Sequence, residues 1–388
     1  MQRIRVAHLI PDLAIGGAET ALVRLLEGLD RARFASLVVT LRDGGELAAP
    51  TARDGGTLAA RAERAAERVV SLGMRTRLPS PRALLRLRAE LRAFAPDVVQ
   101  GWMYHGNLAA WTGVRLLPRR AALAWNIRQS LASLERQRLA TRLVIRAGAR
   151  LSSDADAIVN NSRTSAAQHA ALGFDPRGTE IIPNGFDTRH FRPDPEARAA
   201  LRARLGIAPD VLVAGLVARF DPVKRHDLFL DAVARARRDG LDVHAVVAGP
   251  GATPENRALA ALVARAGLGG TAHLLGTCDD VARVLASLDV LVSASGWAEG
   301  FPNVVGEAMA CGVPCIVTDT GDCAAVVGDA GVVVPPGDAS ALAAALAAML
   351  RRTPAERAAL GERARAHVAS AYGTPRRALP RALASRAR

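Results

Sequence analysis

Lysine is almost absent from this sequence: of 51 basic residues, only Lys224 is a lysine. Cysteine and aromatic residues are also scarce, with four cysteines and 4% Phe, Trp and Tyr. The cysteines form no Cys-x-x-Cys pair and have no histidine at zinc-site spacing, so we expect buried, reduced thiols and no metal site. A lone lysine among arginines suggests a place that needs a compact ammonium, although a single lysine can also arise by chance.

Long apolar runs are missing too. None reaches the roughly 18 residues that a membrane-spanning helix needs, and the first residues do not resemble a secretory signal. We therefore expect a soluble, cytoplasmic protein, with peripheral association at the inner face of the cell membrane as a further expectation.

The positive charge is concentrated in the first half of the chain. Residues 1–190 carry 28 arginines and 17 acidic residues, a net charge of +11, out of +14 for the whole sequence. Such a half can attract nucleic acid, an anionic membrane or a phosphorylated acceptor. No nucleic-acid-binding motif accompanies the charge, so we do not expect a nucleic-acid partner.

Short β-branched runs alternate with longer stretches of helical period along the chain. We predict strands at residues 4–10, 37–41, 68–72, 97–102, 121–125, 157–160, 180–182, 211–218, 243–248, 272–275, 290–294, 315–318 and 331–334. This alternation, seen twice, is typical of α/β domains with doubly wound parallel sheets. We predict one such domain at 1–188, a second at 189–370 and a basic tail at 371–388. Ligands of such sheets bind at the carboxyl ends of the strands.

The most informative motif is residues 299–307, with the sequence EGFPNVVGE, which follows the predicted strand 290–294. A Gly-Phe-Pro turn that opens a helix leaves backbone N–H groups free for a diphosphate. Glu307 suits ribose hydroxyls and Glu299 suits a sugar hydroxyl. The alternative is an ordinary helix N-terminus with acidic residues favoured by the helix dipole.

Two cations follow the predicted strand 211–218. Arg219 offers a fork to phosphate oxygens, and Lys224 offers a point charge, so together they can neutralise a departing nucleotide diphosphate. A solvated loop before the helix predicted at 228–237 is the alternative.

Gly16 and Gly17 follow the first predicted strand. Small residues at a helix start let the backbone approach a phosphate or a donor closely. A tight strand-to-helix turn explains the same pair. The pattern is not GxGxxG and no clear ribose-binding acid follows, which argues against a nicotinamide enzyme.

His105 follows the strand predicted at 97–102, in what we expect to be a loop lined by aromatic residues. A histidine there can contact a sugar or handle a proton, whereas a packing role is the alternative. For His8, inside the first predicted strand, we expect core packing. Asp154 and Asp156 resemble a metal-binding acid pair but precede a strand, so we interpret them as a cap or a strand entry, with metal binding as the alternative.

Together these residues resemble the retaining glycosyltransferases of family four, which have the GT-B fold: two Rossmann-like domains facing a central cleft. The resemblance runs from about residue 6 to residue 338. It rests on the following positions: Gly16-Gly17-Ala18-Glu19, Pro183-Asn184-Gly185, Arg219 with Lys224, Ala248-Gly249-Pro250-Gly251, and Glu299 with Glu307, which match the family's EX7E motif.

The resemblance implies that the first domain is the acceptor-side domain and that the second is the nucleotide-sugar-binding domain, with no cofactor and no metal. It implies catalytic roles for His105, Glu299, Arg219 and Lys224, and donor-binding roles for Gly16, Gly17, Asn126, Arg128, Gly249, Gly300, Phe301, Pro302, Asn303, Val304 and Glu307. Many members have a histidine after the fifth strand, where this chain has Asn126 and Arg128. One of these two, or His105, is then expected to face the transferred sugar.

The predicted reaction is sugar transfer with retention of configuration, with the diphosphate stabilised by Arg219, Lys224 and helix amides. The acceptor is a carbohydrate, a lipid-linked glycan or a small molecule. Basic, apolar segments at residues 81–94 and 129–150 suit an anionic membrane, or are simply solvated helix faces. A nucleotide-sugar epimerase or hydrolase of the same fold and a catalytically silent sugar-binding protein remain as alternatives.

Overall fold

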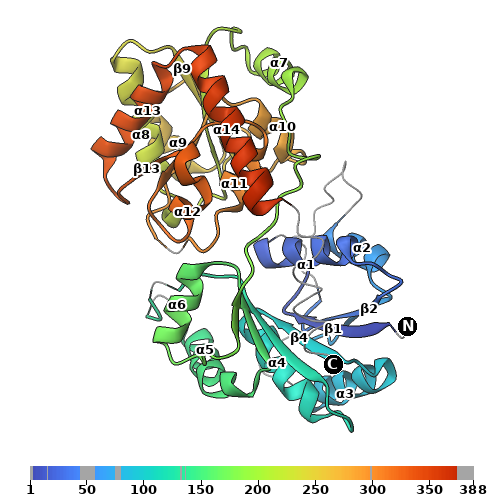
Figure 1. Ribbon diagram of the computed structural model, residues 1–388. Coiled ribbons are helices and arrows are strands. Elements are labelled where there is room, and N and C mark those ends of the chain that lie inside the picture. Colours follow the sequence, from blue (N-terminus) through green and yellow to red (C-terminus); the bar gives the residue numbers. More distant parts are fainter. Residues whose placement is uncertain are drawn as a thin grey trace. The chain divides into compact units, whose positions relative to one another are not determined.

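The chain consists of two α/β units. The computed structural model describes residues 3–14, 16–43, 57–74, 80–131, 133–135, 137–297 and 299–373. The units divide between Pro183 and Asn184, just before the boundary expected after residue 188 (Figure 1). Most of the expected basic tail, residues 374–388, lies outside the described part.

The described residues of the first unit form a seven-stranded parallel sheet in the order β3-β2-β1-β4-β5-β6-β7. Its strands are β1 Ile4–Ile10, β2 Phe34–Thr40, β3 Arg68–Ser71, β4 Val98–Trp102, β5 Ala122–Ile127, β6 Ala157–Asn160 and β7 Thr179–Ile181. Its helices are α1 Gly17–Gly28, α2 Leu58–Ala65, α3 Pro81–Phe94, α4 Met103–Arg115, α5 Leu139–Leu151 and α6 Arg163–Ala171. Helices α1 and α2 pack on one face of the sheet, and α3 and α4 on the other (Figure 1).

The described residues of the second unit form a six-stranded parallel sheet in the order β10-β9-β8-β11-β12-β13. Its strands are β8 Leu212–Val217, β9 Val243–Ala248, β10 Ala272–Leu274, β11 Val290–Ser293, β12 Cys315–Thr318 and β13 Val332–Val334. Its helices are α7 Pro195–Leu205, α8 His226–Arg238, α9 Arg257–Arg265, α10 Val281–Ala286, α11 Asn303–Ala310, α12 Cys323–Val327, α13 Ala339–Leu350 and α14 Pro354–Tyr372. Helices α8, α9 and α13 cover one face, and α10, α11 and α14 the other.

Each of the thirteen predicted strands coincides with an observed strand. Buried parallel strands are continuous runs of branched apolar residues, which makes them easy to recognise. The main difference is at the end of β5, which extends beyond Trp125 through Asn126 and Ile127. Both added residues pair with β6, opposite Val159 and Asn160 respectively.

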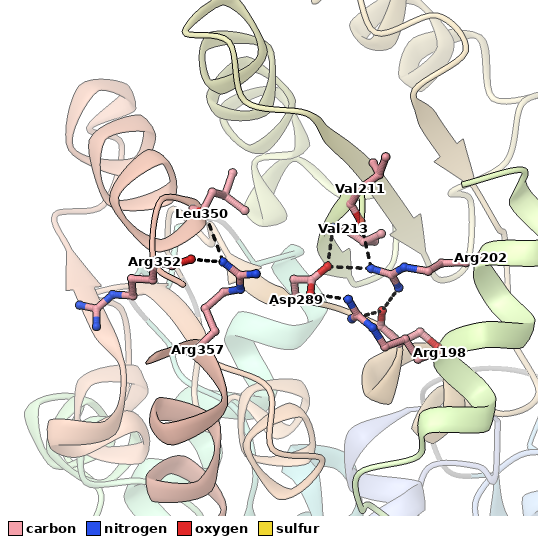
Figure 2. Close-up of polar contacts among 9 residues, drawn as sticks. Arg198, Arg202, Val211, Val213, Asp289, Leu350, Arg352 and Arg357 are labelled. Atoms are coloured by element: carbon pink, nitrogen blue, oxygen red, sulfur yellow. Dashed lines mark hydrogen bonds and ion pairs between the residues drawn. The ribbon is translucent and has the colours of Figure 1, made fainter. Parts of the chain in front are cut away.

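Helix α7 is anchored to the amino edge of the second sheet by a buried carboxylate (Figure 2). Asp289 accepts hydrogen bonds of 2.8 Å each from Arg198 Nη2, Arg202 Nη2 and the backbone N–H of Val213. Elsewhere in the unit, Arg357 in the first turn of α14 donates to the carbonyl oxygen of Leu350, the last residue of α13, at 3.2 Å (Figure 2). These contacts leave the carboxyl edge of the sheet, where ligands of such folds bind, to other residues.

Candidate functional site

An ion pair between two predicted site residues lies at the carboxyl edge of the second sheet. Lys224 Nζ is 2.5 Å from Glu299 Oε2, and the hydroxyl of Ser295 donates to the same oxygen at 2.7 Å. Both charged side chains are largely buried, with 22% of Lys224 and 14% of Glu299 exposed. Partial burial strengthens the attraction compared with a surface pair, so each group fixes the position of the other.

The loop after β8 presents the lysine. Asp221 Oδ1 accepts from the backbone N–H of Val223 at 2.9 Å and opens a short 3-10 helix, residues Pro222–Lys224. The loop after β11 is tied to it, because Gly296 N–H donates to the carbonyl oxygen of Val223 at 2.8 Å. Glu299 lies farther along the β11 loop, so this bond aligns the two loops that bring lysine and glutamate together.

Two glycines allow neighbouring loops to approach this pair. A Cβ atom on Gly321, which has φ +59°, would lie 1.9 Å from the carbonyl oxygen of Glu299. A Cβ atom on Gly249, with φ +135°, would lie 2.3 Å from the carbonyl oxygen of Ala218, next to Arg219. Only glycine fits these positions without backbone movement. The loops after β9 and β12 therefore buttress the site.

Helix α11 begins directly after the loop, with Pro302 at its N-cap and Asn303 as its first residue. The N–H groups of Val305 and Gly306 bond to the carbonyl oxygen of Pro302. Asn303 and Val304, at the predicted diphosphate position, precede the residues whose amides can bond within the helix. Their N–H groups are therefore suited to an anion.

The segment after the unit boundary holds this helix start in place. Asn184 Nδ2 donates to Asn303 Oδ1 at 2.5 Å. The ring of Phe186 stacks on Phe301 with centroids 5.9 Å apart, and Gly306 leaves space for it, since a Cβ there would lie 2.1 Å from the Phe186 ring. Phe301 thus contributes to the core, while its backbone leads into the helix.

Arg219 and Glu307 complete the predicted donor residues of this unit. The side chain of Arg219 is 67% exposed, and its Nε is 3.3 Å from Asp221 Oδ2. Such an exposed pair is weak, so the guanidinium is easily redirected to a phosphate. Glu307 is half-buried one turn into α11. Burial raises the pKa of the Cys311 thiol to about 12, and the negative charge of Glu307 is the second-largest cause.

His226 lies beneath the Lys224 loop. It is 2% exposed, and its ring lies 5.2 Å from that of Phe220. Burial, and next the charge of Lys224, lower the pKa of His226 to about 4. The imidazole is therefore neutral at pH 7 and adds no positive charge to the site.

All four cysteines are free thiols. Burial raises the pKa of Cys323, beside the site, to about 12, with the charge of Glu299 as the next cause. In the described ranges no cluster of three or more His, Cys, Asp or Glu residues could hold a metal ion. Asp154 accepts from Trp111 Nε1 at 2.9 Å, and Asp156, at the entry to β6, accepts from the N–H of Leu123 at 2.8 Å. Both carboxylates thus make structural contacts.

In the first unit, Gly16 is the N-cap of α1 and Gly17 its first residue. A Cβ atom on Gly16 would lie 2.2 Å from the Glu19 carboxylate, so the absence of a side chain lets Glu19 fold back over the helix start. Burial raises the pKa of Glu19. The glycine pair thus serves a tight strand-to-helix turn. Its predicted contact with the nucleotide sugar stays a prediction.

The expectation of a loop at His105 is wrong, because this residue lies in the first turn of α4. Two glycines pack that turn tightly against the sheet. A Cβ atom on Gly101 would meet Asn107 Cα at 2.4 Å, and one on Gly106 would meet the carbonyl oxygen of Leu9 at 2.4 Å. His105 is half-buried beside the carboxyl end of β1.

Asn126 and Arg128 were expected in a loop after the fifth strand; Asn126 instead lies inside β5 and is fully buried. Its Oδ1 accepts from Arg128 Nη1 at 3.3 Å, and its N–H donates to Asn107 Oδ1 at 3.2 Å. Arg128 follows the strand. His8 is fully buried, with its Nδ1 3.0 Å from Gln100 Oε1, so its predicted packing role is confirmed.

Two residues have contacts at this site that could not be expected from the sequence. Ser295, which bonds Glu299, looks like any polar residue at a strand end. Asn184 was recognised only as part of a motif, whereas the structure gives it the role of holding Asn303. Both contacts depend on how the chain folds around the sheet edge. For Ser295, the one signal in the sequence is its position four residues before Glu299.

Comparisons with known proteins cover both units. The family description "Glycosyltransferase Family 4" matches residues 15–190, and "Glycosyl transferases group 1" matches residues 209–352. A D-inositol 3-phosphate glycosyltransferase from Geodermatophilus obscurus is 37% identical over 211 residues, 51% of this chain and 46% of the relative. The putative glycosyltransferase EpsF from Bacillus subtilis is 35% identical over 140 residues, 36% of each chain. These alignments thus span half or less of each curated relative.

Solved structures agree over nearly the whole chain. Anabaena Alr3699/HepE in complex with UDP superposes with a TM-score of 0.81 at 22% identity, covering 98% of this chain and 100% of that one. The lipopolysaccharide glycosyltransferase WaaG gives a TM-score of 0.72 at 18% identity, covering 98% and 99%. Two Rossmann-like units with this likeness have the GT-B fold, and the chain belongs to the family 4 glycosyltransferases.

Proposed function

We propose that this protein is a retaining glycosyltransferase that moves a sugar from a nucleotide-diphosphate sugar to a carbohydrate, lipid-linked or small-molecule acceptor without a metal ion. The observation that carries the proposal is the Lys224–Glu299 ion pair beside the start of α11. A diphosphate needs positive charge and a sugar needs hydrogen-bond acceptors, and this edge of the sheet offers both within one loop cluster. That HepE was crystallised with UDP-glucose supports a nucleotide sugar as donor.

The proposed step breaks the bond between the anomeric carbon and the diphosphate oxygen. The acceptor oxygen then bonds to the same face of that carbon, and its proton passes to a diphosphate oxygen. Negative charge grows on the diphosphate, where Lys224, Arg219 and the α11 amides stabilise it. Glu299, already oriented by Lys224 and Ser295, accepts a hydrogen bond from a hydroxyl of the transferred sugar. No carboxylate is assigned as a covalent nucleophile.

Thermal-shift screening of UDP-, GDP- and ADP-sugars tests the donor site. We expect one nucleotide to raise the melting temperature, since ligands that bind only the folded state stabilise it. Lys224→Ala and Glu307→Ala should lose this shift. Arg235→Ala, which changes a partly exposed residue of α8 away from the ion pair, should keep it. A folded wild-type protein that responds to no nucleotide sugar would contradict the proposal. Product analysis without acceptor separates transfer from epimerisation or hydrolysis.

We also propose contact with an anionic membrane, through the outer faces of α3 and α5. The side chains of Leu139 and Leu143 are 69% and 57% exposed, and Arg146 and Arg150 continue the same stripe of α5 at helical spacing. Leu85 of α3 is 63% exposed. Exposed leucines flanked by arginines suit an interface with anionic lipids, and a solvated face is the alternative. No described helix combines the length and apolarity that crossing a membrane requires.

Vesicle pelleting decides between these two interpretations. The full chain should sediment with phosphatidylglycerol vesicles at low salt and stay in solution with phosphatidylcholine vesicles. Replacing both Leu139 and Leu143 with serine should abolish sedimentation, because it removes the apolar part of the stripe. Equal sedimentation of wild-type and double variant, or none at all, would favour a solvated face.

A further inference from the structure

A row of buried polar side chains crosses three neighbouring strands of the first unit. His8 of β1 pairs in register with Gln100 of β4, and Trp102 of β4 pairs with Asn126 of β5. Residues two apart share a face of a strand, so Gln100 and Trp102 face the same way. This is the face that α1 covers, since Trp102 packs in the same cluster as α1 residues. The row ends at Arg128, at the carboxyl edge.

Polar groups in this row lack partners. Asn126 is fully buried, and its Nδ2 has no hydrogen bond within the described residues. The same is true of Arg128 Nε, also buried. Buried donors without acceptors are rare in native proteins, and each costs free energy. Their presence side by side points to a partner that is not part of the chain.

Among the described residues, no acidic group provides a counter-charge for the guanidinium of Arg128. Its contacts are the Asn126 amide oxygen and the Trp102 ring, whose centroid is 5.6 Å from Cζ. Burial alone lowers the pKa of Arg128, to about 10, so it remains charged at pH 7. The buried Arg202 of the second unit, by contrast, is neutralised by Asp289 at 2.8 Å. The Arg128 residue as a whole is half-buried, and a charge held partly out of water without a counter-charge is unfavourable unless a ligand completes it.

We propose that Arg128 and Asn126 bind an anionic group, a phosphate or a carboxylate, on the acceptor, and so select acidic acceptors. This rests on the proposed glycosyltransferase function. The guanidinium supplies a fork for two anion oxygens, the amide Nδ2 supplies a further donor, and the Trp102 ring flanks the group. The acceptor is favoured over the donor because the cations suited to the donor diphosphate, Arg219 and Lys224, belong to the second unit.

The test compares acidic and neutral sugars on the full chain saturated with UDP. Glucose 6-phosphate and glucuronate should raise the melting temperature at concentrations where glucose does not. Arg128→Met should weaken both acidic ligands by about ten- to a hundredfold, the loss expected for charge-assisted bonds. It should also leave the melting temperature unchanged or higher, because it removes an uncompensated charge. Arg119→Met, an exposed arginine before β5, is the matched control.

Asn126→Asp gives an independent arm that keeps the side-chain shape. It places a carboxylate at the oxygen that Arg128 now contacts, neutralises the guanidinium from within, and should abolish the response to acidic sugars. This arm also decides the question if Arg128→Met does not fold. In both variants the shift caused by UDP should persist, which separates this inference from the donor site.

Three results would overturn the inference. One is a wild-type protein, stabilised by UDP, that does not distinguish glucose 6-phosphate or glucuronate from glucose. Another is an unchanged response in Arg128→Met or Asn126→Asp. The third concerns the donors UDP-glucuronate and UDP-glucose, measured with the same variants. If Arg128→Met and Asn126→Asp weakened only the thermal shift caused by UDP-glucuronate, the anion would belong to the donor sugar. If UDP does not stabilise the wild type, the comparison is made with the nucleoside diphosphate that the donor screen identifies; if none stabilises it, the donor proposal is what falls.

Discussion

The two units share one architecture but differ in how the charged side chains at their candidate sites are compensated. In the second unit the buried charges are paired within the unit: Asp289 with Arg198 and Arg202, and Glu299 with Lys224. In the first unit, Asn126 and Arg128 keep donors without partners. A similar parallel sheet therefore supports a site whose electrostatics are set in advance and a site that is completed by its ligand.

This difference suits the two tasks of a transferase. A diphosphate donor is chemically constant, so a fixed clamp can be built for it, and preorganised charges stabilise a transition state without rearranging. Acceptor substrates vary. A unit with unpaired N–H groups at its site takes its specificity from the ligand that accepts those hydrogen bonds. The charge follows the same division: residues 1–190 carry 28 arginines against 17 acidic residues.

The largest effect on stability should follow from removing the carboxylate that anchors α7 (Figure 2). Asp289→Ala leaves Arg202, 4% exposed, without its counter-charge, and should lower the free energy of unfolding of the second unit by about 3–5 kcal/mol. Urea denaturation measures it. Asp231→Ala removes an exposed pair within α8 and should change stability by less than about 0.5 kcal/mol. Equal effects of the two substitutions would mean that Asp289 is not a buried anchor.

The largest effect on catalysis should come from Lys224. Lys224→Ala removes a charge aimed at the departing diphosphate and should lower kcat/KM by about 100- to 1000-fold. Glu299→Gln should also lower it, and the double variant should lose much less than the product of the two, because each residue positions the other. Steady-state kinetics of the three variants measures this. Independent, multiplying effects would show that the ion pair does not act as a unit.

Sequence alone predicted the framework well and pointed to residues at one edge of the second sheet. Apolar runs indicated every strand, and the lone lysine and the 299–307 motif indicated residues that the structure brings together. The pairing of Lys224 with Glu299, 75 positions apart, could not be predicted, since it depends on β8 and β11 being neighbours. The first unit was predicted less well around its site: polar Asn126 concealed the end of β5, and His105 was placed in a loop although it opens α4.

The smallest effects should appear as a dependence of stability on pH, to which each unit contributes one buried histidine. Burial lowers the pKa of His8 and of His226 to about 4, from 6.5 in the unfolded chain. The unfolded chain therefore binds a proton first, and each residue costs stability as the pH falls from 6.5 towards 4, on the order of 2 kcal/mol at pH 5.

Substitution of these two histidines sharpens the comparison between the units. His226→Phe should be nearly neutral at pH 7, since neither ring nitrogen of His226 has a hydrogen-bond partner among the described residues. His8→Phe should cost about 1–3 kcal/mol at pH 7, because it deprives Gln100 Oε1 of its contact with the ring. Both should flatten the loss between pH 7 and pH 5 in urea denaturation. If both retained the wild-type pH dependence, the acid sensitivity would have to arise from the carboxylates instead, and the paired charges of the second unit would become its source.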